Sequence, residues 1–157
     1  MENYSFLNKY KVLSEGSEND LESIFYPLSS KELEEVEEEF QIHIPHELQR
    51  FYVEIGYGFI NKSSGDFNRL MGPFSFAQIN LKLNEFEYDP DLELYDDLYQ
   101  GEKLLFLEVN EGVYLAIDKI DIEGKNAIYY FKDKIADSLE EFLKQFVDNP
   151  NLIKDLE

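Results

Sequence analysis

Apolar residues recur at helical spacing in the segment that begins at Ser29. Leu33, Val36 and Phe40 mark one face, and glutamates occupy most of the positions between them. A narrow apolar stripe beside an acidic surface is typical of a helix that packs one side on a core and exposes the other. Ser29 and Glu32 have the spacing of a capping box, so the helix is predicted to start there.

A second helix is predicted directly after the Ile44-Pro45 step. Proline disfavours a helical conformation in the residue before it and suits the first turn of the helix that follows. Gly56 and Gly58 provide a C-terminal stop. The apolar face of this helix consists of Leu48, Phe51, Tyr52 and Ile55. Two helices that meet at an angle are therefore expected between Ser29 and Gly58.

The neighbouring segments have weaker periodicity. A short helix is predicted around Leu7, followed by a polar loop over residues 14 to 20. Residues 59 to 76 are predicted to form a loop with a short extended segment. Residues 85 to 101 are predicted to form an acidic, tyrosine-rich connection with one helical turn.

Apolar runs after Gly101 predict β-strands. The sequences KLLFLEV, VYLAID and AIYYFK are rich in β-branched and aromatic residues, and turn signals at residues 110 to 112 and at Gly124 separate them. Three strands joined in sequence by short turns form an antiparallel meander.

A closing helix is predicted after these strands. Asp137 and Glu140 have the spacing of a capping box, and Pro150 ends the helix. Its broad apolar stripe consists of Leu139, Phe142, Leu143, Phe146 and Val147. The order of elements predicts an α+β fold, with N-terminal helices and a C-terminal helix packed on a twisted, mainly antiparallel sheet, in a single domain over residues 1 to 157.

The charge of the chain restricts its partners. Against 14 Lys and Arg stand 34 Asp and Glu, which gives a formal net charge of -20. This charge repels nucleic acid phosphates and anionic lipids, so neither nucleic acid nor membrane is an expected partner. The same charge favours fast encounter with a basic protein, although a solubilising surface also accounts for it.

The sequence contains no cysteine, which excludes disulfides, thiolate metal sites and thiol catalysis. The first residues, MENYSFLNKYKVL, lack the basic start and apolar run of a signal peptide. No stretch approaches the roughly 20 apolar residues of a membrane span. These features predict a cytoplasmic protein.

No catalytic, cofactor-binding or metal-binding residue is predicted. His43 and His46 straddle a helix boundary, whereas metal-binding pairs usually lie on one regular element with further ligands. The acidic run from Asp89 resembles the start of a calcium loop. However, Leu94 stands where Gly is needed and Gln100 where a bidentate Glu is needed. There is no Gly-x-Ser-x-Gly motif, and 34 acids give no specific signal for a catalytic pair.

Several short motifs together resemble one known family. The first is a helix that runs through a short link into an aliphatic-Pro step. Its residues are Val36, Glu37, Phe40, Ile42, Ile44 and Pro45. The sequence FYVEIGYGF follows as a second helix with a glycine turn, LLFLEVNEGVYLAID as two paired strands, and ADSLEEFL as the start of a last helix. With these motifs, residues 25 to 147 resemble the SUKH superfamily, which includes bacterial immunity proteins and fungal cell-wall synthesis regulators.

Some positions depart from the family pattern. Ile44 replaces the usual Leu, Gln41 replaces a common Gly, and Gly56-Tyr57-Gly58 stands where an Asn-Gly turn is frequent. The chain also lacks the Trp that many members carry. These departures concern the subfamily rather than the fold.

The resemblance implies an α+β fold and, for bacterial members, an immunity protein that binds and neutralises a polymorphic toxin, often a nuclease or deaminase. Nucleases present basic substrate-binding surfaces, which an acidic protein can occupy. The expected partner-binding residues are Tyr57, Phe59, Glu87, Tyr88, Asp89, Asp91, Glu93, Tyr95, Asp96, Asp97 and Tyr99. Within this set the tyrosines are expected to act as rigid anchors among steering carboxylates.

Two other functional classes stay open. The eukaryotic branch of the family implies a regulatory or scaffolding domain that binds intracellular partners without inhibiting an enzyme. An acidic hydrolase would require a pocket in which two carboxylates have strongly shifted pKa values.

Overall fold

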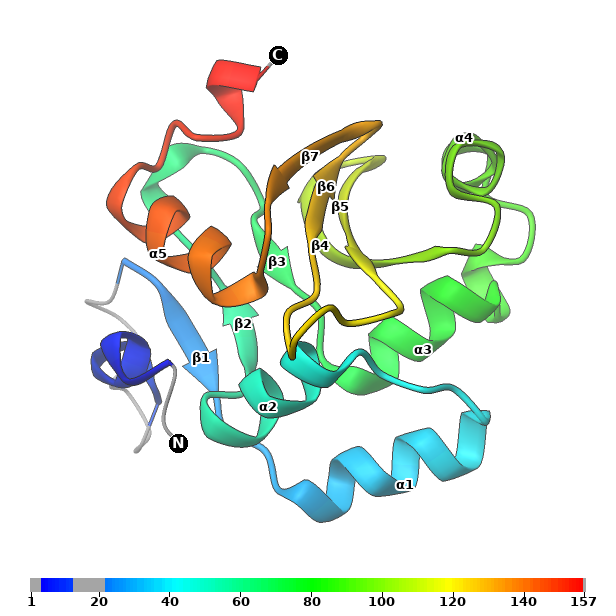
Figure 1. The fold of residues 1–157 in the computed structure, drawn as a ribbon, viewed down its shortest axis with the longest axis horizontal. Coiled ribbons are helices and arrows are strands. Elements are labelled where there is room, and N and C mark those ends of the chain that lie inside the picture. The colour runs from blue at the N-terminus through cyan, green and yellow to red at the C-terminus, as the bar shows by residue number, and fades with distance from the viewer. Residues whose placement is uncertain (1–3, 13–21, 157) are drawn as a thin grey trace.

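The computed structural model describes residues 4–12 and 22–156 (Figure 1). Its helices are η1 (Ser5–Tyr10), α1 (Ser30–Phe40), α2 (His46–Glu54), η3 (Lys62–Ser64), α3 (Pro73–Leu81), η4 (Asn84–Phe86), α4 (Pro90–Tyr99), α5 (Leu139–Asp148) and η5 (Lys154–Leu156). Its strands are β1 (Ile24–Tyr26), β2 (Tyr57–Phe59), β3 (Arg69–Leu70), β4 (Lys103–Asn110), β5 (Val113–Asp118), β6 (Ile128–Tyr130) and β7 (Asp133–Ala136). The predicted α+β fold is confirmed.

The seven strands form one sheet in which spatial order follows chain order, and each neighbouring pair is antiparallel. The predicted meander of β4, β5 and β6 is therefore confirmed. The α-helices enter this order at two connections, with α1 and α2 between β1 and β2, and α3 and α4 between β3 and β4. Figure 1 shows α5 on one side of the sheet, α4 on the other, and α1 and α2 closing one end.

Two apolar clusters lie on the two faces of the sheet. The larger one joins η1, α2 and α5 to the strands, and its ring contacts include Phe106 with Phe142, whose centroids are 6.3 Å apart. The smaller one joins α3 and α4 to β4 and β5 through residues such as Leu92 and Tyr114. Each large side chain that is fully buried stabilises the fold by about 1.5 to 3 kcal/mol. In the described part of the chain, no helix has both the length and the hydropathy of a membrane span.

The predicted break between the first two helices is confirmed, and Glu37 ties its two sides together. Gln41 ends α1 in the left-handed conformation, and the side chain of Ile44 is fully buried. One carboxylate oxygen of Glu37 accepts a hydrogen bond from the Ile44 backbone N–H at 3.0 Å and from the Gln49 side-chain amide at 2.9 Å. The break thus keeps its backbone polar groups satisfied while it turns the chain from α1 into α2.

Several elements differ from the predictions. The short extended segment predicted within residues 59 to 76 is present as β3, but the same segment also contains the start of α3. The predicted single turn in the acidic connection is the ten-residue helix α4. The strands β1, β2 and β7 were not predicted. The helix α3 shows no clear stripe because it is apolar on more than one side and touches both clusters. The helix near Leu7 is confirmed as η1, and the polar loop over residues 14 to 20 lies outside the described residues.

The cap of the last helix lies one residue later than predicted. Ser138, rather than Asp137, is the N-cap of α5, and its hydroxyl accepts a hydrogen bond from the Glu141 backbone N–H at 3.1 Å. The exposed carboxylate of Asp137 instead pairs with Lys134 at 2.8 Å. Two overlapping capping-box patterns are present, Asp137 with Glu140 and Ser138 with Glu141. Because Ser138 is buried and Asp137 is exposed, the second pattern forms the cap.

Replacing Ser138 with alanine is expected to lower the free energy of unfolding by about 1 kcal/mol, because the Glu141 N–H loses its capping acceptor. The matched change Asp137→Ala should leave stability almost unchanged, since it removes only an exposed ion pair. Urea unfolding followed by circular dichroism measures both. A larger loss for Asp137→Ala than for Ser138→Ala would contradict this assignment of the cap.

Candidate functional site

An open apolar groove of about 370 Å³ lies between α1, the start of α3 and the strands β1 to β3. Tyr26 and Tyr57 stand opposite each other on β1 and β2, with ring centroids 5.9 Å apart. On the α3 side Phe74 is 52% exposed and its ring packs edge-on against Phe40. Gly72 allows the close approach of the Tyr57 ring, since a Cβ there would lie 3.1 Å from it. Four aromatic side chains thus line the groove together with aliphatic ones.

A row of directly paired residues connects this groove to the middle of the sheet. Phe59 on β2 pairs with Arg69, Arg69 with Glu108, and Glu108 with Tyr114. Directly opposed residues of an antiparallel sheet point to the same face, so these four side chains lie on the face that α4 covers. Arg69 Nε is 3.2 Å from a carboxylate oxygen of Glu108, and both side chains are partly exposed.

Tyr114, the last residue of this row, lies near the acidic N-terminus of α4. Burial raises the pKa of the Tyr114 hydroxyl. The charged groups that also act on this hydroxyl are Glu108, Asp89, Arg69 and Asp91. Asp91 also lies against the β4–β5 turn, because a Cβ on Gly112 would be 2.8 Å from its carboxylate. The groove and the start of α4 thus occupy one continuous face of the sheet.

The acidic residues predicted to bind a partner lie on or beside α4. No Lys or Arg occurs in the chain between Lys82 and Lys103. Asp89 is the N-cap of α4 and accepts a hydrogen bond from the Asp91 N–H at 2.9 Å, and Asp96 pairs with Lys82 at 2.7 Å. The predicted residues with exposed side chains are Glu87, Tyr88, Asp91, Glu93, Asp96 and Asp97, and Tyr88 is 86% exposed.

Two of the predicted tyrosine anchors, Tyr95 and Tyr99, have buried side chains. The Tyr95 hydroxyl accepts a hydrogen bond from the Tyr114 N–H at 2.9 Å, and its ring stacks on Phe131. The Tyr99 hydroxyl donates to the Phe131 carbonyl at 2.8 Å. Both side chains hold α4 on the sheet. Their spacing from Leu92 is helical, a signal of core packing in a segment for which the sequence analysis predicts only one helical turn.

The other two predicted residues, Tyr57 and Phe59, both line the groove. The groove's remaining wall was not predicted, because residues 59 to 76 were expected to form a loop with a short extended segment rather than the start of a helix. Gly72-Pro73 is a typical helix start, since proline suits the first helical position, and this signal would have placed Phe74 on a helix. Arg69 carried no local signal, because its role depends on the pairing of β3 with β4.

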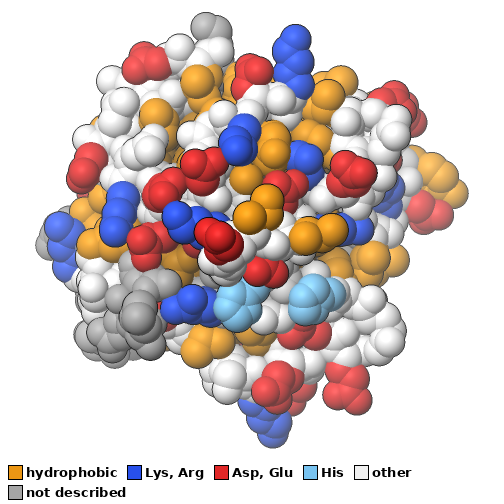
Figure 2. Space-filling model, in the orientation of Figure 1, with side chains coloured by type: hydrophobic (Ala, Val, Ile, Leu, Met, Phe, Trp, Pro, Cys, Tyr) orange, Lys and Arg blue, Asp and Glu red, His pale blue; other side chains and the backbone are white. Residues whose placement is uncertain are grey.

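Potential metal ligands and buried acidic groups were compared among the residues that the structure describes. No group of three or more potential ligands in this part of the chain could hold a metal ion, and both histidines are exposed on the face seen in Figure 2.

Burial raises the pKa of the Glu47 carboxyl, which is 5% exposed. Its neighbours are backbone N–H groups of Asn126, Leu139 and Glu140. This buried carboxylate therefore joins α2 to α5 and to the β5–β6 connection.

Comparison with known proteins places this fold in a family. A Bacillus subtilis (strain 168) protein named immunity protein YxxD is 40% identical over 147 residues, which cover 94% of this chain and 96% of that relative. No solved structure is significantly similar to the chain. The model of the SMI1 / KNR4 family (SUKH-1) matches residues 27–145. The resemblance seen in the sequence motifs is confirmed, and the chain belongs to the SMI1 / KNR4 family (SUKH-1).

Proposed function

We propose that this chain is a non-enzymatic immunity protein that binds a protein toxin and neutralises it. The name of the Bacillus subtilis relative and the extent of its similarity support this role. The observation in the structure that supports it best is the continuous face that combines the aromatic groove with the acidic N-terminus of α4. Aromatic side chains in a concave site are typical anchors of a protein interface, and flanking charges set the rate of association.

The charge of this chain fits a toxin that is a basic domain of the nuclease or deaminase type. A domain that acts on nucleic acid carries a cationic surface for the phosphates. The net charge of -20 and the exposed carboxylates of α4 complement such a surface. Binding there would cover the toxin's substrate-facing side, so inhibition needs no chemistry from the immunity protein.

The same proposal places the protein in the cytoplasm, where such a toxin reaches its substrates. The absence of cysteine fits a reducing compartment. In this role the chain requires no metal or cofactor, because recognition depends on side chains alone.

Co-expression tests the proposed function. The panel consists of toxin domains encoded beside genes of this family, each produced with and without this chain. We expect growth arrest by one toxin to be relieved, and the purified pair to form a one-to-one complex in which toxin activity is lost. Replacing both Tyr57 and Phe74 with serine should weaken binding at least tenfold, because the groove loses two exposed rings.

The matched control is Val53→Ser, which alters a side chain that is 51% exposed on α2, outside the groove. It should leave binding unchanged. If no toxin of the panel is bound or neutralised, the immunity role fails, and the regulatory or scaffolding class becomes the better account of the family membership.

A further inference from the structure

The outer side of α4 carries two exposed leucines. Leu94 is 54% exposed and Leu98 is 38% exposed. Residues four positions apart are neighbours on the surface of a helix, so the two side chains form one short apolar ridge. This ridge does not hold α4 on the sheet, because the side that packs there consists of Leu92, Tyr95 and Tyr99. Figure 1 shows α4 at the right-hand edge of the molecule, where its outer side is open to a partner.

Carboxylates border the leucine ridge. Asp91 precedes Leu94 by three positions and Asp97 follows it by three, so both are its neighbours on the helix surface. Both acidic side chains are exposed. Asp91 also lies against Gly112 of the β4–β5 turn, where Glu111 is exposed and adds a further negative charge. The ridge is therefore an apolar strip within an acidic surface.

The acidic charge around the ridge is not balanced locally. Residues 83 to 102 contain eight Asp and Glu residues and no Lys or Arg. The lysines at the two ends of this segment are already paired, Lys82 with Asp96 at 2.7 Å and Lys103 with Asp118 at 3.2 Å. Among the residues that the structure describes, Asp96 is the only carboxylate of the segment in an ion pair. The carboxylates beside the ridge thus present uncompensated negative charge.

This combination of charge and shape indicates what covers the ridge. A second copy of the chain would bring the same carboxylates together, and like charges across an interface disfavour binding. A cationic surface is complementary instead. A ridge of residues four apart packs into the groove between the side-chain rows of another helix, and charges beside such a contact select the partner. The occupant that fits best is a cationic amphipathic helix.

We propose that Leu94 and Leu98 pack against an amphipathic helix of the toxin whose apolar stripe is bordered by Lys and Arg. This inference rests on the proposed function and deepens it, because it adds a contact separate from the groove and defines the surface that meets it. The two leucines anchor the complex once it has formed, whereas the carboxylates beside them accelerate its formation.

The experiment uses the toxin domain neutralised in the co-expression panel. Surface plasmon resonance measures association and dissociation rates for the unmodified chain, the double variant L94Q/L98Q and the control Val53→Gln. Glutamine has nearly the helix propensity of leucine and adds no charge, so α4 should be retained. We expect the double variant to dissociate at least about 30-fold faster, while its association rate and the salt dependence of that rate stay within about twofold. The control, exposed on α2, should leave both rates unchanged.

A photo-crosslinking amino acid at position 94 identifies the surface that meets the ridge. The crosslink should fall on the apolar stripe of a toxin helix with Lys or Arg beside it, while the same group at position 53 gives none. Dissociation of L94Q/L98Q within about threefold of the unmodified chain overturns this inference and leaves the immunity role intact. A crosslink to a strand, to an acidic surface or to a second copy of this chain does the same. Failure of the unmodified chain to bind any toxin of the panel overturns both.

Discussion

Glu47→Ala is expected to lower the free energy of unfolding by about 3 to 4 kcal/mol. The carboxylate accepts hydrogen bonds from the backbone N–H groups of Asn126 and Leu139, and a longer one of 3.4 Å from Glu140. Each buried donor that loses its acceptor costs about 1 to 3 kcal/mol. For a chain of this length the loss corresponds to a fall in melting temperature of roughly 10 °C, measurable by calorimetry.

Glu47→Gln is the matched control, because a side-chain oxygen can still accept from Asn126 and Leu139 while the charge is removed. Burial raises the pKa of Glu47 in the folded state, so the folded protein binds the proton more tightly than the unfolded chain. The stability contribution of this group is therefore fully present below the unfolded pKa and is lost as pH rises through the raised folded pKa. Relative to the unmodified protein, Glu47→Gln should become progressively more stable as pH rises above the ordinary carboxyl pKa of 4.5.

Two results would count against this role of Glu47. One is an alanine variant as stable as the glutamine variant, which would mean that the backbone donors find other partners. The other is a stability difference between Glu47→Gln and the unmodified protein that does not change with pH. Urea unfolding at several pH values distinguishes the two variants.

Charge reversal on α4 is expected to slow association with the toxin about tenfold or more at low ionic strength. The triple variant replaces Asp91, Glu93 and Asp97 with lysine, since all three side chains are exposed. These carboxylates flank the proposed binding face, and complementary charge chiefly accelerates encounter. The dependence of the association rate on salt should become weaker as well.

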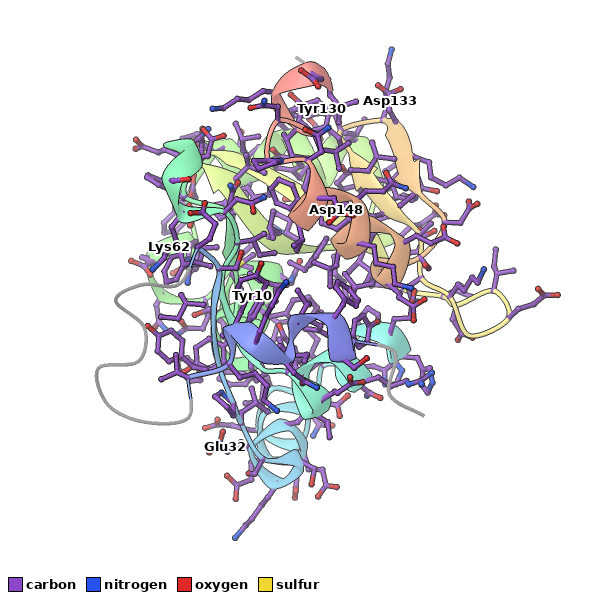
Figure 3. The ribbon with its side chains drawn as sticks, turned by 90° about the vertical axis from the view of Figure 1, so that its left-hand side faces the viewer. Tyr10, Glu32, Lys62, Tyr130, Asp133 and Asp148 are labelled. Carbon is purple, nitrogen blue, oxygen red and sulfur yellow. The ribbon has the colours of Figure 1, made fainter. Side chains whose placement is uncertain are left out.

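The control variant reverses Asp133, Asp148 and Asp155, which are also exposed. Figure 3 views the molecule from the α5 side and labels the first two. Each reversal adds two positive charges, so three of them bring the net charge from -20 to -14 in both variants. Stopped-flow association should show a much smaller effect for the control. Equal slowing by the two variants would mean that net charge alone steers the encounter and that α4 is not at the interface.

The helices and strands with strong local signals were predicted correctly. The capping serine and the Ile44-Pro45 step defined α1 and α2, and the apolar runs between turn signals after Gly101 defined β4 to β6. The strands β1 and β3 have only three and two residues, too few for periodicity to distinguish them from a loop. Their pairing with distant strands, rather than their own composition, makes them part of the sheet.

The candidate site was predicted only in part, for the same reason. Tyr57 and Phe59 were recognised, but Tyr26, Arg69 and Phe74 join them only because β1, β3 and α3 converge in space. Composition does not distinguish two roles of Tyr95 and Tyr99, because an amphipathic aromatic residue serves equally well as a surface anchor or as a buried group with a satisfied hydroxyl.

The agreement between strand order and chain order has a consequence for the speed of folding. Strands β4 to β7 and α5 follow one another through short connections, so their contacts close small loops and can form early. Pairing β1 with β2 must first close the long connection that holds α1 and α2, at a greater cost in chain entropy. The walls of the groove depend on these non-local pairings, so we expect the groove to assemble only after the C-terminal half has provided the sheet on which it is built.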